Sequence, residues 1–450
     1  MMTRHRRDPM HENVEDKFVT LWNLGNTCYL NSVVQVLRHT TSLYGSLSDL
    51  SEQIARYSRH RLETELALQA LTTDNGCCAS EPSPSALVEE EHHERELLLA
   101  QHLCSLVAYC NFLERDADGG TVSFSDSLME VGLGSDYALG CRRLKEYIAN
   151  VYPLFEGSHQ QDAQEAFSVL VGVLNSVDER LAEAGFPRPS PSPTQPPCRV
   201  TPFEGRIKVV TQCCECESTS ERVEPFTSIG VSLNAEAADD DSPPEAWLFE
   251  LFGQRQRLTG ADKYHCEQCA TRCEALQTLQ MEELPTVLVF HLKCFSGSHR
   301  RASFQPLVYS PKRYSFLSSD VADQLGVKVL PTKRVPPRLQ YPLAFVKTAV
   351  NEDASQEAKA EVKSVGLPEQ PPTRYNLCAA VVHKGRSLAG GHYYAYVKAD
   401  MSDRAGEGEK YQWVKLNDTD CEKLSNVQVA RALRPEFIAT PYLLFYKRKT

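Results

Sequence analysis

The spacing of hydrophobic residues changes along the chain, from helical in the first third to strand-like afterwards. Between Phe18 and about Gly185, apolar side chains recur every three or four residues, which places them on one helix face. This spacing predicts a helix near Cys28 and helices across 99–113 and 163–174. After residue 200, runs rich in β-branched residues predict strands at 206–210, 223–233, 287–292, 375–383, 392–398, 412–416 and 442–447. Together these elements predict an α+β fold.

Polar, acidic and proline-containing segments interrupt this pattern. Residues 1–17 are interpreted as a polar tail, and stretches near 72–96, 187–197 and 351–372 as insertions. The first of these contains the acidic run Glu89–Glu94, interpreted as a solvated insertion. The 450 residues are sufficient for a large core divided into two or three subdomains.

Composition and charge narrow the functional classes. A net charge of −11 argues against broad nucleic-acid binding. The first 25 residues contain no apolar signal-like stretch, and no later run approaches about 18 apolar residues, so we expect an intracellular protein without membrane contact. The 16 cysteines are then expected to be reduced, which favours catalysis, metal binding or packing over a disulfide framework.

Cys28 lies where a turn leads into the first predicted helix. Gly25, Asn26 and Thr27 supply the turn and a helix N-cap. A cysteine in a first helical turn meets the positive end of the helix dipole, which favours the thiolate. The alternative is a buried structural cysteine.

His392 provides a base for this thiol from a distant part of the chain. It begins an alternating strand directly after Gly390 and Gly391, which leave room for close approach of another backbone. A cysteine and a histidine far apart in sequence are a common source of nucleophile and base. The alternative for His392 is a structural hydrogen bond.

Three further residues complete a candidate catalytic group. Asn417 and Asp418 follow a predicted strand and are candidates to orient the histidine, although the same residues suit a simple turn. The side chain of Asn23, with the backbone N–H of Cys28, is a candidate oxyanion hole. The alternative for Asn23 is again a turn residue.

Two Cys-x-x-Cys pairs form a second candidate site, at Cys213 and Cys216 and, about 50 residues later, at Cys266 and Cys269. Four thiolates at this spacing suit one structural zinc ion. Cys214 and Cys273 are spare thiols, and either is able to replace a predicted ligand. The alternative is a set of four thiols without metal.

The run from Ser158 to Glu165 predicts the start of another helix. Ser158 and Gln161 have the spacing of a capping box. Capping does not account for the acceptors at Asp162 and Glu165, which suit contact with a basic peptide.

Together these segments resemble the ubiquitin-specific protease family, a papain-like group of deubiquitinating enzymes. The Cys28 segment, Gln161–Glu165, the two cysteine pairs and Gly391-His392-Tyr393 occur in the family's order, and the similarity covers roughly residues 18 to 448. Further landmarks of the family are similar to the segments 284–288, 292–293 and 442–446.

The resemblance implies a papain-like cysteine peptidase with a thumb at about 18–185, zinc-bearing fingers at about 200–285 and a palm at about 286–450. It also implies that ubiquitin threads its C-terminal tail between thumb and palm. The substrate contacts that it implies are Gln161, Asp162, Gly390, Gly391 and Tyr393. Two departures from the family pattern, Ala166 in place of an aromatic residue and Cys294 in place of arginine, are interpreted as packing changes.

The leading hypothesis is therefore a thiol-dependent deubiquitinase with one structural zinc ion per chain, acting on ubiquitin and ubiquitinated proteins. Its alternatives are a protease for a ubiquitin-like modifier and a catalytically silent ubiquitin-binding scaffold. A zinc-ribbon nucleic-acid module is weaker, because glutamates dilute the basic residues around the cysteine pairs. The sequence identifies no regulatory protein partner.

Overall fold

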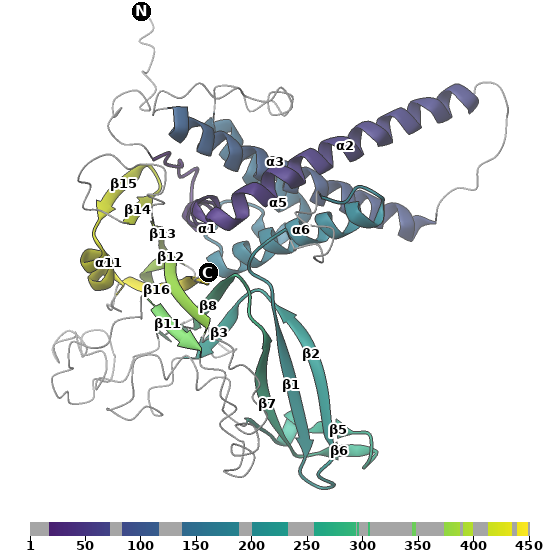
Figure 1. Cartoon of the computed structure of the whole chain (residues 1–450), viewed down its shortest axis with the longest axis vertical. Helices are drawn as coiled ribbons and strands as arrows, with labels where there is room; N and C mark the ends of the chain where they lie inside the picture. Colours follow the sequence, from purple (N-terminus) through teal and green to yellow (C-terminus); the bar gives the residue numbers. More distant parts are fainter. Residues whose placement is uncertain are drawn as a thin grey trace, which may run out of the picture.

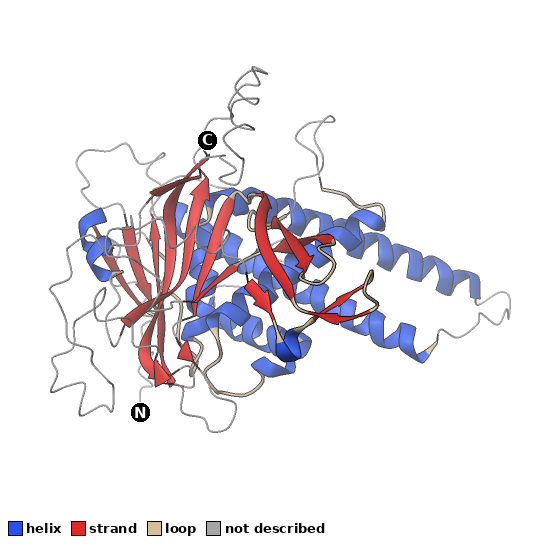
Figure 2. Ribbon diagram, turned by 90° about the horizontal axis from the view of Figure 1, so that it is seen from below, coloured by secondary structure: helices blue, strands red, loops and turns tan. Residues whose placement is uncertain are grey.

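A layer of helices packs against one face of a large sheet, and a smaller sheet projects from the body (Figures 1 and 2). This computed structural model describes residues 18–72, 83–116, 137–188, 200–232, 256–293, 295–296, 305–306, 344–347, 373–387, 390–398, 413–433 and 439–448. The predicted tail 1–17, the insertion 351–372, most of the connector 187–197 and Cys294 lie outside these residues.

The helical layer is built around one short, nearly fully buried helix, α1 (Cys28–His39). Buried apolar side chains along α1 and α6 make one continuous core with the large sheet. The predicted helical faces are confirmed, since Leu103 and Phe167 are both almost fully buried. The surrounding helical elements are α2 (Thr41–Thr72), α3 (Pro84–Asp116), α5 (Tyr137–Val151), the 3-10 turn η2 (Pro153–Phe155) and α6 (Ala163–Glu183).

The large sheet has eight strands, seven of them in the order β15-β14-β13-β12-β16-β8-β3, with β11 also paired to β12. Alternate residues face opposite sides. Ala395 and Phe445 face the helical core, while Tyr396 and Tyr446 face a second core that includes the short helix α11 (Asn426–Ala432). The strands are β3 (Ile229–Ser232), β8 (Val287–Lys293), β11 (Ala344–Lys347), β12 (Thr373–Ser387), β13 (Gly390–Lys398), β14 (Trp413–Asn417), β15 (Asp420–Leu424) and β16 (Ala439–Arg448).

The projecting sheet carries the cysteine pairs at its far end (Figure 1). Its strands, in the order β2-β1-β7-β4, are β1 (Gly205–Cys213), β2 (Thr219–Phe226), β4 (Gln256–Leu258) and β7 (Ala275–Glu283). The hairpin of β5 (Tyr264–Cys266) and β6 (Thr271–Cys273) lies beside it, after the 3-10 turn η3 (Gly260–Asp262). A separate two-stranded sheet joins β9 (Phe295–Ser296) and β10 (Gln305–Pro306).

The predicted α+β class is confirmed, and the predicted strands are present. One local expectation was wrong: α3 begins at Pro84, so the acidic run Glu89–Glu94 is helical, although it is solvent-exposed as expected. Pro84 suits a first helical turn, where its missing N–H costs no hydrogen bond. Arg61 of α2 then pairs with Glu90 and Glu94 of α3. The limits of thumb, fingers and palm stay predictions.

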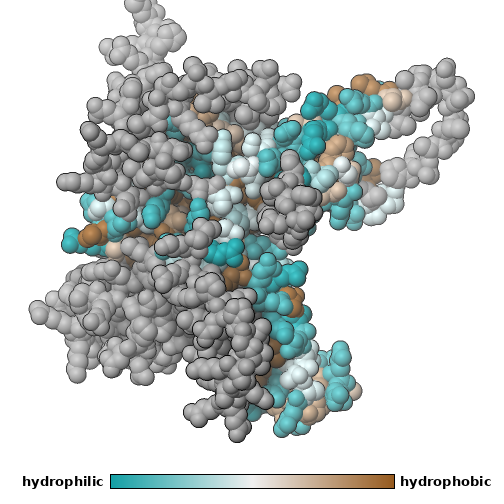
Figure 3. Space-filling model, viewed as in Figure 1, coloured by the Kyte–Doolittle hydropathy of each residue, from teal (hydrophilic) through white to brown (hydrophobic). Residues whose placement is uncertain are grey.

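Helices α2 and α3 extend beyond the body as an antiparallel pair (Figure 1). Figure 3 shows hydrophobic residues scattered over the hydrophilic surface of this pair. Leu62 and Leu66 of α2 and Leu87 of α3 are exposed. The stretch Leu87–Glu114 is long and apolar enough to cross a membrane, which the sequence analysis missed. Of the apolar 18-residue window within it, 56% is buried, as in the core helix of a globular domain.

Candidate active site

Cys28 is the first residue of α1, at the end of a turn with two left-handed residues. Gly25 has φ 97° and Asn26 φ 54°, conformations that glycine and asparagine tolerate best. Thr27 occupies the N-cap position but makes no side-chain cap bond. Its hydroxyl accepts from the backbone N–H of Leu24 instead (3.0 Å), so Thr27 is the N-cap residue, as predicted, but its side chain does not cap the helix. The turn places the Cys28 thiol at the helix N-terminus.

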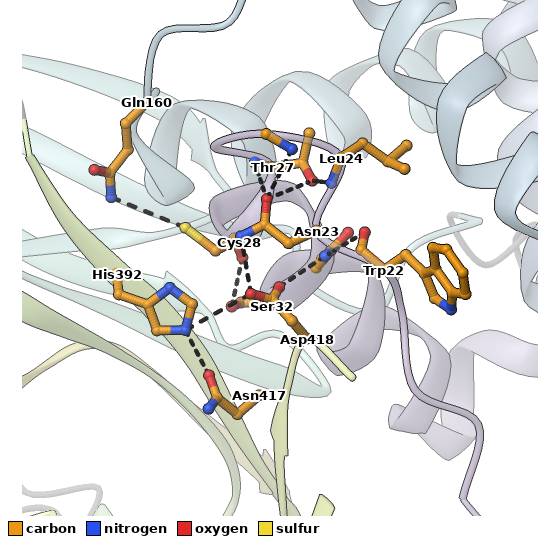
Figure 4. Close-up of polar contacts among 12 residues, drawn as sticks. Trp22, Asn23, Leu24, Thr27, Cys28, Ser32, Gln160, His392, Asn417 and Asp418 are labelled. Atoms are coloured by element: carbon orange, nitrogen blue, oxygen red, sulfur yellow. Dashed lines mark hydrogen bonds and ion pairs between the residues drawn. The ribbon is translucent and has the colours of Figure 1, made fainter. Parts of the chain in front are cut away.

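Packing of α1 against β13 brings His392 to Cys28 (Figure 4). The Nε2 atom of His392 lies 2.5 Å from Oδ1 of Asn417, at the end of the adjacent strand β14. This leaves Nδ1 for the thiol. A hydrogen bond with Cys28, and secondarily one with Asn417, raises the pKa of His392 to about 9, although burial opposes this. The predicted nucleophile, base and orienting residue are therefore together.

Asp418 connects the histidine to the segment before Cys28. One carboxylate oxygen accepts from Nδ2 of Asn23 at 2.9 Å and the other from Nδ2 of Asn31 at 2.8 Å. The carboxylate also lies 3.7 Å from Nε2 of His392. Asp418 has φ 50°, a conformation in which aspartate is among the favoured residues. The sequence analysis named Asp418 but missed Asn31.

The side chain of Asn23 is held at both ends. Its Oδ1 accepts from the backbone N–H groups of Gly25 (3.1 Å) and Thr27 (3.2 Å), and Asp418 accepts one of its two Nδ2 protons. An amide carries two such protons, so one N–H remains to meet an oxyanion. The geometry is compatible with the oxyanion role predicted from sequence.

The two glycines before His392 have different environments. A Cβ on Gly391 would lie 2.5 Å from Nε2 of His383, and Gly391 has φ 156°. Position 391 therefore has no room for a side chain and needs glycine. A Cβ on Gly390, by contrast, would meet no atom within 4 Å. Tyr393 is fully buried and packs on His383 with ring centroids 4.6 Å apart. The ring of Tyr393 thus lies inside the core in this structure, and the substrate contact expected at this residue stays a prediction.

Asp162 begins α6 and links it to the sheet. Its Oδ1 accepts from the backbone N–H of Gln164 (2.7 Å), and its Oδ2 accepts from the Tyr442 hydroxyl (2.5 Å). The predicted capping box of Ser158 and Gln161 was therefore wrong, because Asp162 is the N-cap. In the described part of the chain Gln161 makes no side-chain hydrogen bond, whereas its neighbour Gln160, which the sequence analysis did not select, contacts Cys28.

A second candidate site lies at the end of the projecting sheet. The sulfur atoms of Cys213, Cys216, Cys266 and Cys269 all lie within 4.8 Å of one another. Four thiolates around one zinc ion at about 2.3 Å are separated by about 3.8 Å, so this cluster fits a tetrahedral ion. Cys214 is exposed. These four cysteines therefore form a group able to bind a metal ion.

Comparison with known proteins agrees with this geometry. The family described as ubiquitin carboxyl-terminal hydrolase matches residues 19–446. The chain is 24% identical to ubiquitin carboxyl-terminal hydrolase creB of Emericella nidulans, over 98% of this chain and 55% of creB. It is also 24% identical to ubiquitin carboxyl-terminal hydrolase 9X of Mus musculus, over 90% of this chain and 14% of that protein. The chain spans about half the length of the creB relatives that it matches.

The fold also resembles a solved structure, that of the SAGA Ubp8/Sgf11/Sus1/Sgf73 DUB module bound to ubiquitin aldehyde. The match has a TM-score of 0.54 and 18% identity, and covers 98% of this chain and 71% of the other. At this identity the likeness establishes the fold alone. The family match extends over nearly the whole described chain and includes both halves of the site. The chain therefore belongs to the ubiquitin carboxyl-terminal hydrolase family.

Proposed function

We propose that this protein is a thiol-dependent deubiquitinase that hydrolyses peptide or isopeptide bonds at the C-terminal glycine of ubiquitin. The observation that carries the proposal is the assembly of Cys28, His392 and Asn417 across the contact of α1 with β13 and β14. Family membership supplies the substrate class, and the related module described above is bound to ubiquitin aldehyde.

The reaction follows from the positions of these groups. The Cys28 sulfur attacks the glycine carbonyl carbon, and His392 holds the thiol proton and passes it to the leaving amine. The carbonyl oxygen, now negative, accepts from the Cys28 backbone N–H and the remaining Asn23 N–H. Water then attacks the thioester, giving one proton to His392 and returning the thiol with a free glycine carboxylate.

The proposal is tested with ubiquitin bearing a thiol-reactive group at its C-terminus. We expect the wild-type protein to form a covalent adduct and Cys28→Ala to form none, measured by intact-protein mass spectrometry. Unlabelled wild-type protein, or equal labelling of the alanine variant, would contradict the proposal. Running ubiquitin-like modifiers in parallel tests the alternative of a different modifier, and ubiquitin binding without hydrolysis would favour a silent scaffold.

The pH dependence of activity follows from the raised pKa of His392, which is about 9. The imidazolium that protonates the leaving amine persists up to that pH, so we expect kcat/KM to fall with a midpoint near 9. The Asn417 hydrogen bond raises this pKa, so Asn417→Ala should move the midpoint downward. Initial rates on a fluorogenic ubiquitin amide between pH 6 and 10 measure both profiles. A midpoint that Asn417→Ala leaves unchanged would contradict the assignment.

We also propose that the four-cysteine cluster holds one structural zinc ion. The donor set and the spacing of its sulfur atoms support this, and the ion would tie β5–β6 to the end of β1. We further infer that the protein is intracellular, because 16 cysteines suit a reducing compartment. We propose that ubiquitin and ubiquitinated proteins are its partners.

Zinc content provides a direct prediction. Freshly purified protein should contain about one zinc ion per chain, and Cys269→Ser should lose it with a lower Tm, because metal binding contributes to folding stability. Cys214→Ser is the matched control, since this exposed thiol lies outside the cluster. Elemental analysis and thermal unfolding measure the two effects. Metal-free wild-type protein, or zinc retained in Cys269→Ser, would refute the site.

A further inference from the structure

The half-buried side chain of Gln160 lies against the Cys28 thiol. Its Nε2 atom is 4.0 Å from the Cys28 sulfur, within reach of an N–H to sulfur contact. Figure 4 shows Gln160 and His392 approaching the sulfur from different directions, with Asn23 and Asp418 on the opposite side of Cys28. Gln160 therefore directs a donor toward the sulfur and not toward the Asn23 side of the site.

The loop that carries Gln160 is attached at several points to its surroundings. The Lys145 ammonium donates to the carbonyl of Phe155 and, at 3.1 Å, to the hydroxyl of Tyr29, the residue after Cys28. The Phe155 and Tyr29 rings stack with centroids 6.0 Å apart. These contacts fix the start of the loop against α1.

The end of the loop is fixed as firmly. The Asn26 side chain, in the turn before Cys28, donates to the Ser158 carbonyl at 2.7 Å. Two residues after Gln160, Asp162 is held by Gln164 and Tyr442. Residues 156–159 are nonetheless exposed, so the loop has no apolar core of its own that these contacts would support. Their consequence is a donor with a defined position before substrate arrives, as electrostatic stabilisation requires.

We propose that Gln160 is a further catalytic residue, whose Nε2–H donates to the Cys28 sulfur and stabilises the thiolate. The assignment rests on the proposed thiol chemistry and divides the donors of the site: Gln160 serves the sulfur, while Asn23 and the Cys28 backbone N–H serve the oxyanion. Hydrogen bonding to a charged form favours that form. His392 and Tyr29 are titratable groups that interact with Cys28; Asp418 acts in turn on His392, and Lys145 is bonded to Tyr29.

The test measures the pH dependence of iodoacetamide alkylation at Cys28 in the free enzyme, by mass spectrometry of the peptide that contains it. Only the thiolate reacts, so the acid limb of the profile reports thiolate formation. With Gln160→Ala we expect the rate at pH 6 to fall about three- to tenfold, with an unchanged plateau at high pH, because one pH unit is tenfold in thiolate fraction. Gln160→Glu should fall further, because it places a carboxylate beside the sulfur.

His159→Ala is the matched control, since this adjacent side chain is exposed and should leave the profile unchanged. On a fluorogenic ubiquitin amide, the loss in kcat/KM for Gln160→Ala should be larger at pH 6 than at pH 8.5. Acid limbs unchanged in both Gln160 variants, or a pH-independent rise in KM alone, would overturn the assignment. The protein could also show an acid limb that depends on Gln160 and yet fail to react with the ubiquitin probe. That result would support the role of Gln160 at the thiol and contradict the proposed function.

Discussion

Replacing His392 by alanine is expected to lower kcat on a fluorogenic ubiquitin amide by about 10,000-fold or more, the scale seen when a nucleophile loses its base. His392 bonds both Cys28 and Asn417, and no second base occupies this position in the described structure. Ubiquitin affinity should be similar in Cys28→Ala and in the double variant Cys28→Ala/His392→Ala, because the imidazole acts on the proton and not on the ubiquitin surface.

His383 provides the informative comparison for this experiment. It lies near His392, but burial lowers its pKa to about 4, so it is neutral at physiological pH and remains packed behind Gly391 and Tyr393. It therefore cannot supply the proton that the leaving amine needs at pH 7. If His392→Ala retained more than about one hundredth of wild-type kcat, another group would be the base, since general acid–base catalysis alone contributes about that much or more.

Replacing Asp418 by alanine is expected to lower kcat about 100- to 1,000-fold, the scale of losing one oxyanion donor. Its carboxylate holds Asn23 and Asn31 and faces His392, so both the oxyanion hole and the imidazolium lose support. Because Asp418 acts through Asn23, the double variant with Asn23→Ala should lose much less than the product of the two single losses. Kinetic double-mutant cycles measure this coupling.

Two controls separate this role from turn geometry. Alanine at φ 50° costs about 1–2 kcal/mol of stability, whereas asparagine tolerates the left-handed region. Asp418→Asn should nevertheless lose activity, since one amide oxygen cannot accept in place of two carboxylate oxygens. Asp420→Ala, at the exposed first position of β15 directly after this turn, should stay near wild-type activity. An Asp418→Asn enzyme with wild-type kcat, or additive losses with Asn23→Ala, would refute the proposed coupling.

Much of the candidate site was predictable from local sequence. Cys28 follows a turn and opens an amphipathic helix, and His392 follows two glycines at the start of a strand. In each Cys-x-x-Cys pair, likewise, the two cysteines are only three positions apart, so their spacing is visible in a short stretch of sequence. In each case the chemistry depends on side-chain type and short-range geometry, which the order of residues expresses directly.

Other features depended on contacts between distant segments. Gln160 and Gln161 are identical in type, and only the attachments of the loop determine which of them reaches the thiol. The capping box suggested by Ser158 and Gln161 was wrong because Asp162 caps α6 while also bonding Tyr442, 280 residues away. The need for glycine at 391 arises from the His383 ring on the neighbouring strand, and has no local signal.

The sequence by itself determined the α+β class, the candidate nucleophile with its candidate base, and the four thiols of the candidate metal site, because helical period, strand alternation and ligand spacing are local properties. The tertiary structure alone decided which side chains meet. Packing of α1 on β13 and β14 brings Asp418 to Asn23 and Asn31, contacts that span almost 400 residues. Such pairings follow from burial of the whole core, which no short segment specifies.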